Sequence, residues 1–409
     1  MKKANTNLES FSCRFVPCKF GAIHKSALVI VAAMLVLTAA ATMSAQPPIK
    51  IGPKAVENRV VTQNFLSELA DNLNEKMKGR SAGYAFTVIA DGFISVSRVG
   101  GDARRVPDAN PRKMSYADKY NVASVSKTIT AAAVMKLLSE KGISLDSPIY
   151  PHLPPNWTTF GNFAKEVTFR QLLTHRSGIR CPTEVTYSEL KMCIAKGILP
   201  ELAKTQQYNN SNYGLFRILI PRLNGFYVSK DSTDAAASKL YAGYYEQYVQ
   251  NNVFKPLGLT GIYQKPDLKD PALAYQYPSP VVAGTDFGDM TETGASRGWV
   301  MDSRQLAIFI NGLVYSGKVV SKQIAKQMKD ENLGLWPTTV DGKVVSWEHG
   351  GYFPAKKTNV AWGSDGELNS LIINFPNGVS VGVIVNSQFV SDKNIPDSVR
   401  AAMAEVSKK

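Results

Sequence analysis

Ser124 and Lys127 are the two residues of this sequence whose types and spacing most directly suggest chemistry. Residues three apart on a helix lie on one face, about one turn from each other, so the serine hydroxyl is expected beside the lysine amine. A serine hydroxyl is a weak nucleophile near neutral pH, whereas an amine whose pKa is lowered by apolar surroundings can accept its proton. Ser124 is therefore a candidate nucleophile and Lys127 its candidate base.

An apolar run after Lys127, which includes Ile129 and Leu138, predicts the buried helix that would lower this pKa. The alternative interpretation is a helix cap beside a solvated lysine. The same four-residue pattern recurs at Ser188 and Lys191, in a polar amphipathic stretch, and there we expect it to be a chance match.

The elements around this segment are strand-like near both ends of the chain and helical between them. Period-two patterns rich in β-branched and aromatic residues predict the strands, and an Asp91-Gly92 turn is expected to join the first two. Apolar residues at helical spacing predict helices outside them. The predicted strands lie at 84–90, 93–99, 343–348, 359–362, 368–375 and 379–385, and the predicted outer helices lie within 56–79 and 396–406.

This order predicts an α/β domain in which the two ends of the chain close one sheet, with a helical domain inserted. The sheet domain would comprise residues 46–141 and 336–409, and the insert residues 142–335. At 409 residues with 44% hydrophobic content, the chain can bury one large core or two smaller ones.

The first 45 residues differ from the rest. Scattered lysines and arginines precede an apolar run over 27–41, and small residues at 43–45 offer a cleavage site, so we expect an export signal and a periplasmic or secreted protein. An uncleaved inner-membrane anchor is the alternative. The net charge of +14 is spread along the chain, which favours a solvated surface over a nucleic-acid module. Association with anionic cell-wall polymers or membrane surfaces stays open.

Two of the four cysteines, Cys13 and Cys18, lie within the expected signal, which leaves Cys181 and Cys193. Two cysteines in an oxidising compartment predict one disulfide, and two separate thiols are the alternative. The four histidines have no paired ligand spacing, so we expect no metal site and no cofactor.

Five motifs follow one another over more than two hundred residues: Ala123–Val134, Leu172–Ile179, Tyr208–Leu215, Pro256–Leu259 and His349–Gly351. In sequence and in order they resemble the motifs of the class C β-lactamase and penicillin-binding-protein-like serine hydrolases. The resemblance implies the family fold, an α/β domain with an antiparallel sheet plus an all-helical domain.

The resemblance implies a role for each site residue. Ser124 would be the acylated nucleophile, Lys127 its partner, and Tyr208 with Asn210 the second motif. A phenol whose pKa is lowered by a neighbouring ammonium could pass a proton to the leaving group, and the amide could bind a substrate carbonyl. The backbone N–H groups of Ser124 and Tyr352 would form the oxyanion hole.

The sequence departs from the family at His349, Gly350 and Gly351, where β-lactamases carry Lys-Thr-Gly. Gly350 has no hydroxyl and a histidine is mostly neutral near pH 7, so contacts for a substrate carboxylate are weakened. We therefore expect neutral esters or amides to be favoured, unless Lys356 or Lys357 supplies the missing charge. A structural role is the alternative for His349, and for His175 it is the expected one.

A different class of enzyme is suggested by Gly294–Gly298, which matches the Gly-x-Ser-x-Gly elbow of α/β-hydrolases around Ser296. Asp302 or Asp341 and then His349 follow in the required order, but the stretch before the elbow is loop-like rather than a buried strand. The favoured interpretation is an exported serine hydrolase acting on a small-molecule or peptidoglycan-like ester or amide, as an esterase or D-amino-acid peptidase. A β-lactamase, a D,D-carboxypeptidase and a non-catalytic cell-wall-binding protein are the alternatives.

Overall fold

The computed structural model describes residues 61–90, 95–179, 181, 186–265, 267–278, 282–354 and 366–408. The expected export segment, the Asp91-Gly92 turn, the predicted strand at 359–362, and Lys356 and Lys357 lie outside these residues. Within the described ranges, no helix combines the length and the apolar character that crossing a membrane would need.

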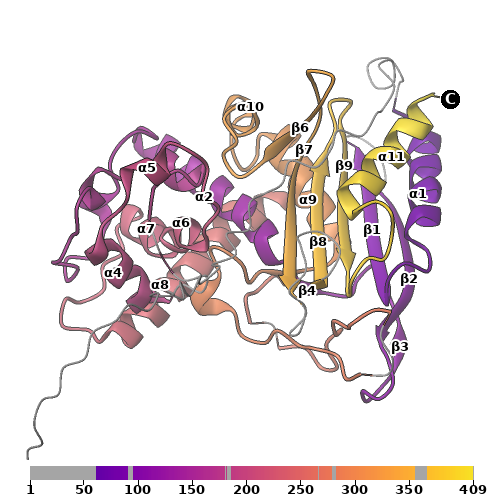
Figure 1. Cartoon of the computed structure of the whole chain (residues 1–409), viewed down its shortest axis with the longest axis horizontal. Coiled ribbons are helices and arrows are strands. Elements are labelled where there is room, and N and C mark those ends of the chain that lie inside the picture. Colours follow the sequence, from indigo (N-terminus) through magenta and orange to yellow (C-terminus); the bar gives the residue numbers. More distant parts are fainter. Residues whose placement is uncertain are drawn as a thin grey trace, which may run out of the picture. The chain divides into compact units, whose positions relative to one another are not determined.

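The centre of the fold is a seven-stranded antiparallel sheet in the order β3-β2-β1-β9-β8-β7-β6 (Figure 1). The N-terminal strand β1 pairs directly with the C-terminal strand β9, as in the pair Ala85 and Ile384, so the two ends of the chain close the sheet. This confirms the predicted fold class. The strands are β1 (Gly83–Ala90), β2 (Val96–Arg104), β3 (Arg112–Lys113), β6 (Trp336–Val340), β7 (Lys343–Pro354), β8 (Gly366–Asn374) and β9 (Val379–Val385).

Helices cover both faces of this sheet, because side chains alternate between the faces along each strand. Val381, Val383 and Val385 of β9 pack with α1 (Gln63–Met77) and α11 (Ile395–Lys408) on one face. On the other face α9 (Ser303–Asn311) lies so close over β9 that a side chain at Gly382 would collide with its backbone. Figure 1 shows α1 and α11 side by side against the sheet.

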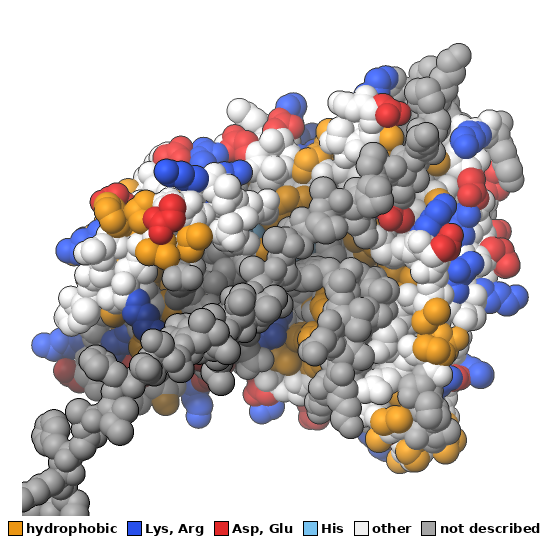
Figure 2. Space-filling view, viewed as in Figure 1, with side chains coloured by type: hydrophobic (Ala, Val, Ile, Leu, Met, Phe, Trp, Pro, Cys, Tyr) orange, Lys and Arg blue, Asp and Glu red, His pale blue; other side chains and the backbone are white. Residues whose placement is uncertain are grey.

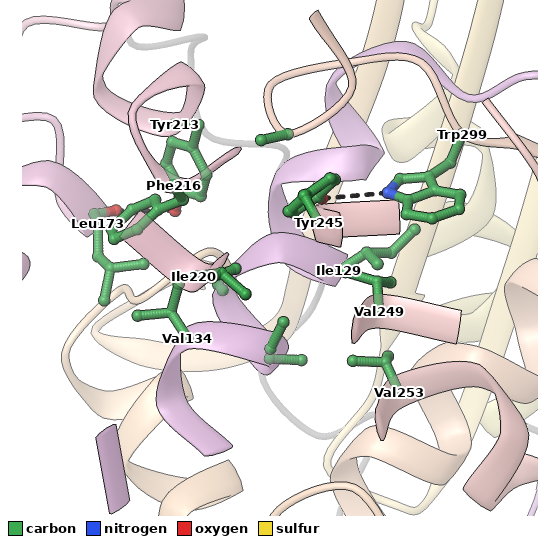
Figure 3. Close-up of a cluster of buried hydrophobic side chains, with 14 of the residues drawn as sticks. Ile129, Val134, Leu173, Tyr213, Phe216, Ile220, Tyr245, Val249, Val253 and Trp299 are labelled. Atoms are coloured by element: carbon green, nitrogen blue, oxygen red, sulfur yellow. Dashed lines mark hydrogen bonds between the residues drawn. The ribbon is translucent and has the colours of Figure 1, made fainter. Parts of the chain in front are cut away.

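One helix, α2 (Ser126–Lys141), carries the candidate chemistry and is buried on nearly all sides. It packs against the helices that follow it, and Figure 3 shows Ile129 and Val134 of α2 among Phe216, Tyr245 and Trp299. A helix that is apolar all round must be enclosed by the rest of the fold. The apolar surroundings predicted for Lys127 are therefore provided by side chains far away in the sequence.

The middle of the chain is mainly helical, as the sequence predicts, but α9 belongs to the sheet layer. The predicted insert ended at residue 335, whereas α9 packs on β1, β8 and β9. The periodicity of a helix shows that one face is apolar without showing which layer buries it. The helices of this region, besides α9, are α3 (Phe169–Leu173), α4 (Tyr187–Lys196), α5 (Pro200–Ala203), α6 (Asn210–Gly214), α7 (Phe216–Leu223), α8 (Asp234–Val249) and α10 (Lys322–Asp330).

Short elements link these helices and turn the chain toward the sheet. In a separate two-stranded pair, β4 precedes η1 and α2, and β5 precedes α9. The short elements are β4 (Tyr120–Asn121), β5 (Val300–Met301), η1 (Ala123–Val125), η2 (Tyr150–His152), η3 (Ala164–Glu166), η4 (Gln250–Phe254), η5 (Lys255–Leu257), η6 (Thr291–Thr293) and η7 (Gly312–Ser316).

Charged side chains are interspersed over the visible face of the molecule. Figure 2 shows lysines and arginines among aspartates and glutamates rather than one broad basic area. Ion pairs such as Lys76 with Glu405 and Arg98 with Asp71 place opposite charges next to each other on partly exposed side chains. Such exposed pairs each contribute little to stability.

Candidate active site

Ser124 lies in a tight turn, the 3₁₀ turn η1, between β4 and α2. The residue before it, Ala123, has a φ of 44°, a backbone conformation that costs a non-glycine residue about 1–3 kcal/mol. Asn121 stabilises the turn by accepting the Ala123 N–H with its side chain at 2.8 Å, and the Val122 N–H donates to the Trp299 carbonyl at 2.8 Å. These contacts fix the backbone that presents the Ser124 hydroxyl.

Strand β7 runs beside this turn, at Gly351. A side chain at Gly351 would collide with the Val122 carbonyl and the Ser370 hydroxyl, so this position requires glycine. Ser370, which pairs with Gly351 from β8, donates its hydroxyl to the Val122 carbonyl at 2.7 Å. The nucleophile turn and the sheet are therefore held in direct contact.

The amine of Lys127 is surrounded by three oxygens. Its Nζ lies 3.0 Å from Ser124 Oγ, 2.8 Å from Asn210 Oδ1 and 2.8 Å from the Ser296 carbonyl. A neutral amine has two N–H donors and one lone pair. The amide and carbonyl oxygens can only accept, so they take both donors, and the lone pair is left facing the Ser124 hydroxyl.

The protonation state of Lys127 follows from its burial. Its side chain is 0% exposed, and this burial, with a smaller effect from the charge of Arg297, lowers its pKa well below the usual value. Removing an ammonium from water disfavours the charged form because the lost hydration is not replaced. The lowered pKa favours the neutral form of the amine, and that form could accept the Ser124 proton.

Tyr208 donates its phenol to Ser124 Oγ at 2.7 Å, and the Lys127 amine lies 4.9 Å from the centre of its ring. Burial raises the pKa of this phenol, while the bond to Ser124 and the charge of Arg297 oppose that effect. The sequence analysis expected a lowered pKa for Tyr208, but burial outweighs the opposing effects and raises it. Tyr208 is a proton donor in the resting site.

The imidazole ring of His175 packs against the ring of Tyr208. Its ring lies 4.5 Å from the tyrosine ring, and its Nδ1 accepts the Asn209 N–H at 3.2 Å and lies 3.1 Å from the amide nitrogen of Asn212. The side chain is 0% exposed, and burial lowers the pKa well below the usual value, so the imidazole is neutral. These contacts are those of a positioning residue, as the sequence predicts.

Asn210 begins α6 one residue after the helix cap Asn209, whose side chain accepts the Ser211 N–H at 2.9 Å. The cap orients the first helical residue, and in this way Asn210 Oδ1 reaches the Lys127 amine. The sequence predicted a substrate contact for Asn210. In the structure its oxygen also takes one of the two lysine donors.

His349 lies on β7 with its Nδ1 3.1 Å from the Gly334 carbonyl and 3.0 Å from the Thr128 hydroxyl. Its ring packs edge-on against Trp336 at 4.4 Å. Burial lowers its pKa to about 3, so His349 adds no positive charge to the site. A structural role for this side chain is supported by each of these contacts.

Tyr352 follows Gly351 on β7, so its backbone lies one residue past the contact with η1. The neighbouring strand β6 ends opposite Glu348, and among the described residues 349–354 pair with β8 alone. The two N–H groups assigned to the oxyanion hole come from two neighbouring segments, η1 and β7.

The competing motifs do not assemble a site. Ser188 and Lys191 are both bonded to Asp234 instead of to each other. Ser296, the elbow candidate, donates its hydroxyl to the Thr293 carbonyl, and Asp302 caps α9 by accepting the Gln305 N–H at 2.8 Å. The residues before Ser296 form the 3₁₀ turn η6 and not a strand.

Two functional positions were missed by the sequence reasoning. The Ser296 carbonyl holds the lysine amine, and the next residue, Arg297, places a positive charge near it. Every residue has a backbone carbonyl, so residue types in the sequence give no signal of its role. Arg297, in contrast, was visible within the Gly294–Gly298 stretch, and its signal was a charged residue in an otherwise small and apolar segment.

A disulfide joins Cys181 to Cys193 of α4, with their Cα atoms 5.6 Å apart. The Cys181 carbonyl accepts the side-chain N–H of Asn209 at 3.3 Å. The pair therefore anchors the segment that contacts the loop carrying Tyr208 and Asn210.

The family model described as Beta-lactamase matches residues 69–404. Protein flp of Staphylococcus aureus (strain MRSA252) is 25% identical over 233 residues, which cover 52% of this chain and 42% of that protein. PbpX of Bacillus subtilis (strain 168) is 24% identical over 288 residues, covering 67% of this chain and 63% of PbpX. The chain thus matches less than two thirds of either relative's length.

Among solved structures, D-amino acid amidase from Ochrobactrum anthropi SV3, complexed with D-phenylalanine, is similar with a TM-score of 0.63 at 19% identity. The alignment covers 85% of this chain and 99% of the amidase. At this identity the similarity concerns the fold.

Proposed function

This chain belongs to the Beta-lactamase family, and from that membership together with the site geometry we propose that it is a serine hydrolase. Ser124 attacks the carbonyl of an ester or amide and forms an acyl-enzyme, which water then hydrolyses. The observation that carries the proposal is the buried Lys127 amine, which lies 3.0 Å from Ser124 Oγ and 2.8 Å from both Asn210 Oδ1 and the Ser296 carbonyl.

The first half of the reaction transfers one proton at each step. As Ser124 Oγ bonds to the substrate carbonyl carbon, its proton moves to the neutral Lys127 amine. The oxyanion that forms accepts the N–H groups of Ser124 and Tyr352. When the tetrahedral intermediate collapses, the leaving group takes the Tyr208 proton, and Lys127 returns its own proton to the phenolate.

The second half repeats these transfers with water. Water occupies the place of the departed group, loses a proton through Tyr208 and Lys127, and attacks the acyl carbonyl. Ser124 recovers its proton as the acid departs. No step needs a group beyond the chain, the substrate and water.

An amide or ester of a D-amino acid is the substrate class that the comparison favours, because the similar solved structure is that of a D-amino acid amidase. Peptidoglycan-like peptides share that stereochemistry. The neutral His349 supports a neutral leaving group, since burying a carboxylate without a charged or donor partner is unfavourable.

A panel of substrates tests this proposal with purified protein. We expect hydrolysis of D-phenylalanine amide and of a neutral short-chain ester, a slower reaction with the L-amide, and poor turnover of a cephalosporin and of a D-Ala-D-Ala peptide. Each is measured as kcat/KM beside an uncatalysed blank. Faster turnover of the cephalosporin would instead identify a β-lactamase, of the D-Ala-D-Ala peptide a D,D-carboxypeptidase, and no turnover with any would support a binding protein.

We further propose that residues 1–45 direct export and that Cys181 and Cys193 are oxidised outside the cytoplasm. The support is the basic then apolar N-terminal pattern together with the disulfide. Cys193→Ser should lower the free energy of unfolding by about 2–4 kcal/mol, because the unfolded chain has more conformational entropy without the cross-link. Urea denaturation with and without reductant measures this. Two freely alkylated thiols in native periplasmic protein would contradict the proposal.

A further inference from the structure

A cavity of about 580 Å³ lies beside β2 and β3, at the edge of the sheet opposite to β6 and β7 (Figure 1). Its walls come from these two strands, from the loop that joins them, and from Tyr275, Gln276 and Val282. Four strand spacings of about 4.8 Å separate β2 from β7, the strand that contacts the Ser124 turn. The cavity is therefore a second site, about 19 Å across the sheet from the proposed chemistry.

Positive charge dominates the walls of this cavity. Asp102 lies 2.8 Å from Lys113 Nζ and 3.7 Å from Arg105 Nε. Arg112 is paired with Asp118 instead, at 2.7 Å. An excess of one sign of charge inside a concave site attracts ligands of the other sign. The charged residues that line the cavity are four cations and one carboxylate: Arg104, Arg105, Arg112, Lys113 and Asp102.

The guanidinium of Arg104 is held in place at the wall of the cavity. The residue is 8% exposed, and it donates Nε to the Ala109 carbonyl at 2.8 Å and Nη1 to the Pro271 carbonyl at 2.7 Å. Within the part of the chain that the structure describes, Nη2 makes no hydrogen bond and no carboxylate pairs with Arg104. A largely buried charge without an opposite partner is unfavourable, so this group favours an anion in the cavity.

Tyr275 gives the cavity a rigid floor. The residue is buried, and its hydroxyl accepts the Arg105 N–H at 2.8 Å while donating to Asp108 at 2.8 Å. Asp108 also accepts the Gly284 N–H at 3.0 Å, so both of these contacts engage its carboxylate. With Asp108 and Asp118 included, the four cations still outnumber the three carboxylates.

Apolar side chains stand exposed next to this charge. Val106 is 63% exposed and Val282 is 46% exposed, and both line the cavity. Figure 2 shows hydrophobic side chains gathered at the lower right of the molecule, where Figure 1 places β3. A soluble phosphate ester gains nothing from exposed valines, whereas a phospholipid carries its phosphate directly beside its acyl chains. The combination of charge and apolar surface therefore fits a lipid.

We infer that this end of the molecule binds the surface of an anionic phospholipid bilayer. A lipid phosphate occupies the cationic cavity, and Val106 and Val282 enter the boundary between headgroups and acyl chains. Guanidinium groups suit this role because their fork of N–H donors matches the oxygens of a phosphate. The lipid contact is independent of the proposed hydrolase function, since it uses none of the residues around Ser124.

Cosedimentation of the full chain with vesicles measures the charge dependence. We expect tighter binding to vesicles of phosphatidylcholine with 30% phosphatidylglycerol than to phosphatidylcholine alone, and weaker binding as salt is added. The double variant Arg105→Gln/Lys113→Gln should bind the anionic vesicles about 25-fold more weakly, at about fivefold for each cation near the surface. Both side chains reach solvent, so the fold should tolerate these changes.

A matched double variant separates the cavity from net charge. Lys318→Gln/Lys326→Gln removes two exposed cations from another part of the chain, and its affinity for the anionic vesicles should stay within about twofold of the wild type. The apolar run over 27–41 is present in every variant, so binding through that segment cannot produce a difference between the two double variants.

A tryptophan at the rim reports the contact locally. Val106→Trp should add blue-shifted emission on the anionic vesicles, beyond the signal of the five native tryptophans, and acyl-chain-brominated lipid should quench it. Tyr227→Trp, at a 66% exposed position of the helical region, is the control and should show neither change.

Three results would overturn the lipid site: equal affinity for the two kinds of vesicle, equal affinities of the two double variants, or an unshifted emission of Val106→Trp on anionic vesicles. Titration with glycerophosphoglycerol, the headgroup without acyl chains, covers the remaining occupant. Saturable binding of that diester to the wild type, without a preference between the vesicles, would assign the cavity to a soluble phosphate ester and also overturn the lipid site. Hydrolysis and labelling of Ser124 decide the proposed function separately.

Discussion

Ser124→Ala should reduce kcat by at least about 10⁴-fold on any substrate that the wild type turns over, because no other group can form the acyl-enzyme. The Lys127 amine and the Tyr208 phenol both lie within hydrogen-bond distance of the Ser124 hydroxyl. Without that hydroxyl they have no nucleophile to activate. Steady-state rates with the fastest substrate of the panel give the measurement.

Ser188→Ala is the matched control for this variant. Ser188 has the same four-residue pattern with Lys191, but its hydroxyl is bonded to Asp234 on the protein surface. We expect its rate to equal that of the wild type. Residual turnover in Ser124→Ala within tenfold of the wild type would exclude Ser124 as the nucleophile.

Lys127→Met should lower kcat/KM by about 10²–10⁴-fold, the usual contribution of a positioned general base. Methionine keeps the length and the apolar packing of the side chain while removing the lone pair that faces Ser124. Lys191→Met provides the control from the second Ser-x-x-Lys pattern, and its activity should be unchanged.

The pH dependence gives the same variant a second readout. Burial lowers the pKa of Lys127, so the neutral amine is the form present above that value and the ammonium the form below it. Wild-type kcat/KM should therefore rise with pH and level off well below 10.5, the ordinary pKa of lysine. This limb should be absent in Lys127→Met. A limb that persists there would assign the base to another group.

Local geometry explains why part of the site could be predicted from the sequence. Ser124 and Lys127 are three residues apart, and any helical backbone brings such a pair together. The closure of the sheet by β1 and β9 likewise follows from strand patterns near both ends of the chain. These features depend on residue types and spacing alone.

Other features depend on packing between distant segments and could not be predicted. The Ser296 carbonyl meets Lys127 across 169 residues, and no pattern of residue types reports such a contact. The direction of the Tyr208 pKa shift was misjudged because the pKa is raised mainly by burial of the phenol, and that burial comes from the packing of distant segments. The positive φ of Ala123 is imposed by contacts from Asn121 and Trp299, and alanine gives no local signal of it.

The central claim is that Ser124 is the residue activated by a neutral Lys127, and covalent labelling tests it most directly. The wild-type protein is treated with a fluorophosphonate at several pH values, digested, and examined by mass spectrometry for the modified peptide. We predict a single adduct on Ser124 whose rate of formation rises with pH along the limb assigned to Lys127, and none in Ser124→Ala. An adduct on Ser296 or Ser188, or a Ser124 adduct whose rate is unchanged in Lys127→Met, would contradict the claim.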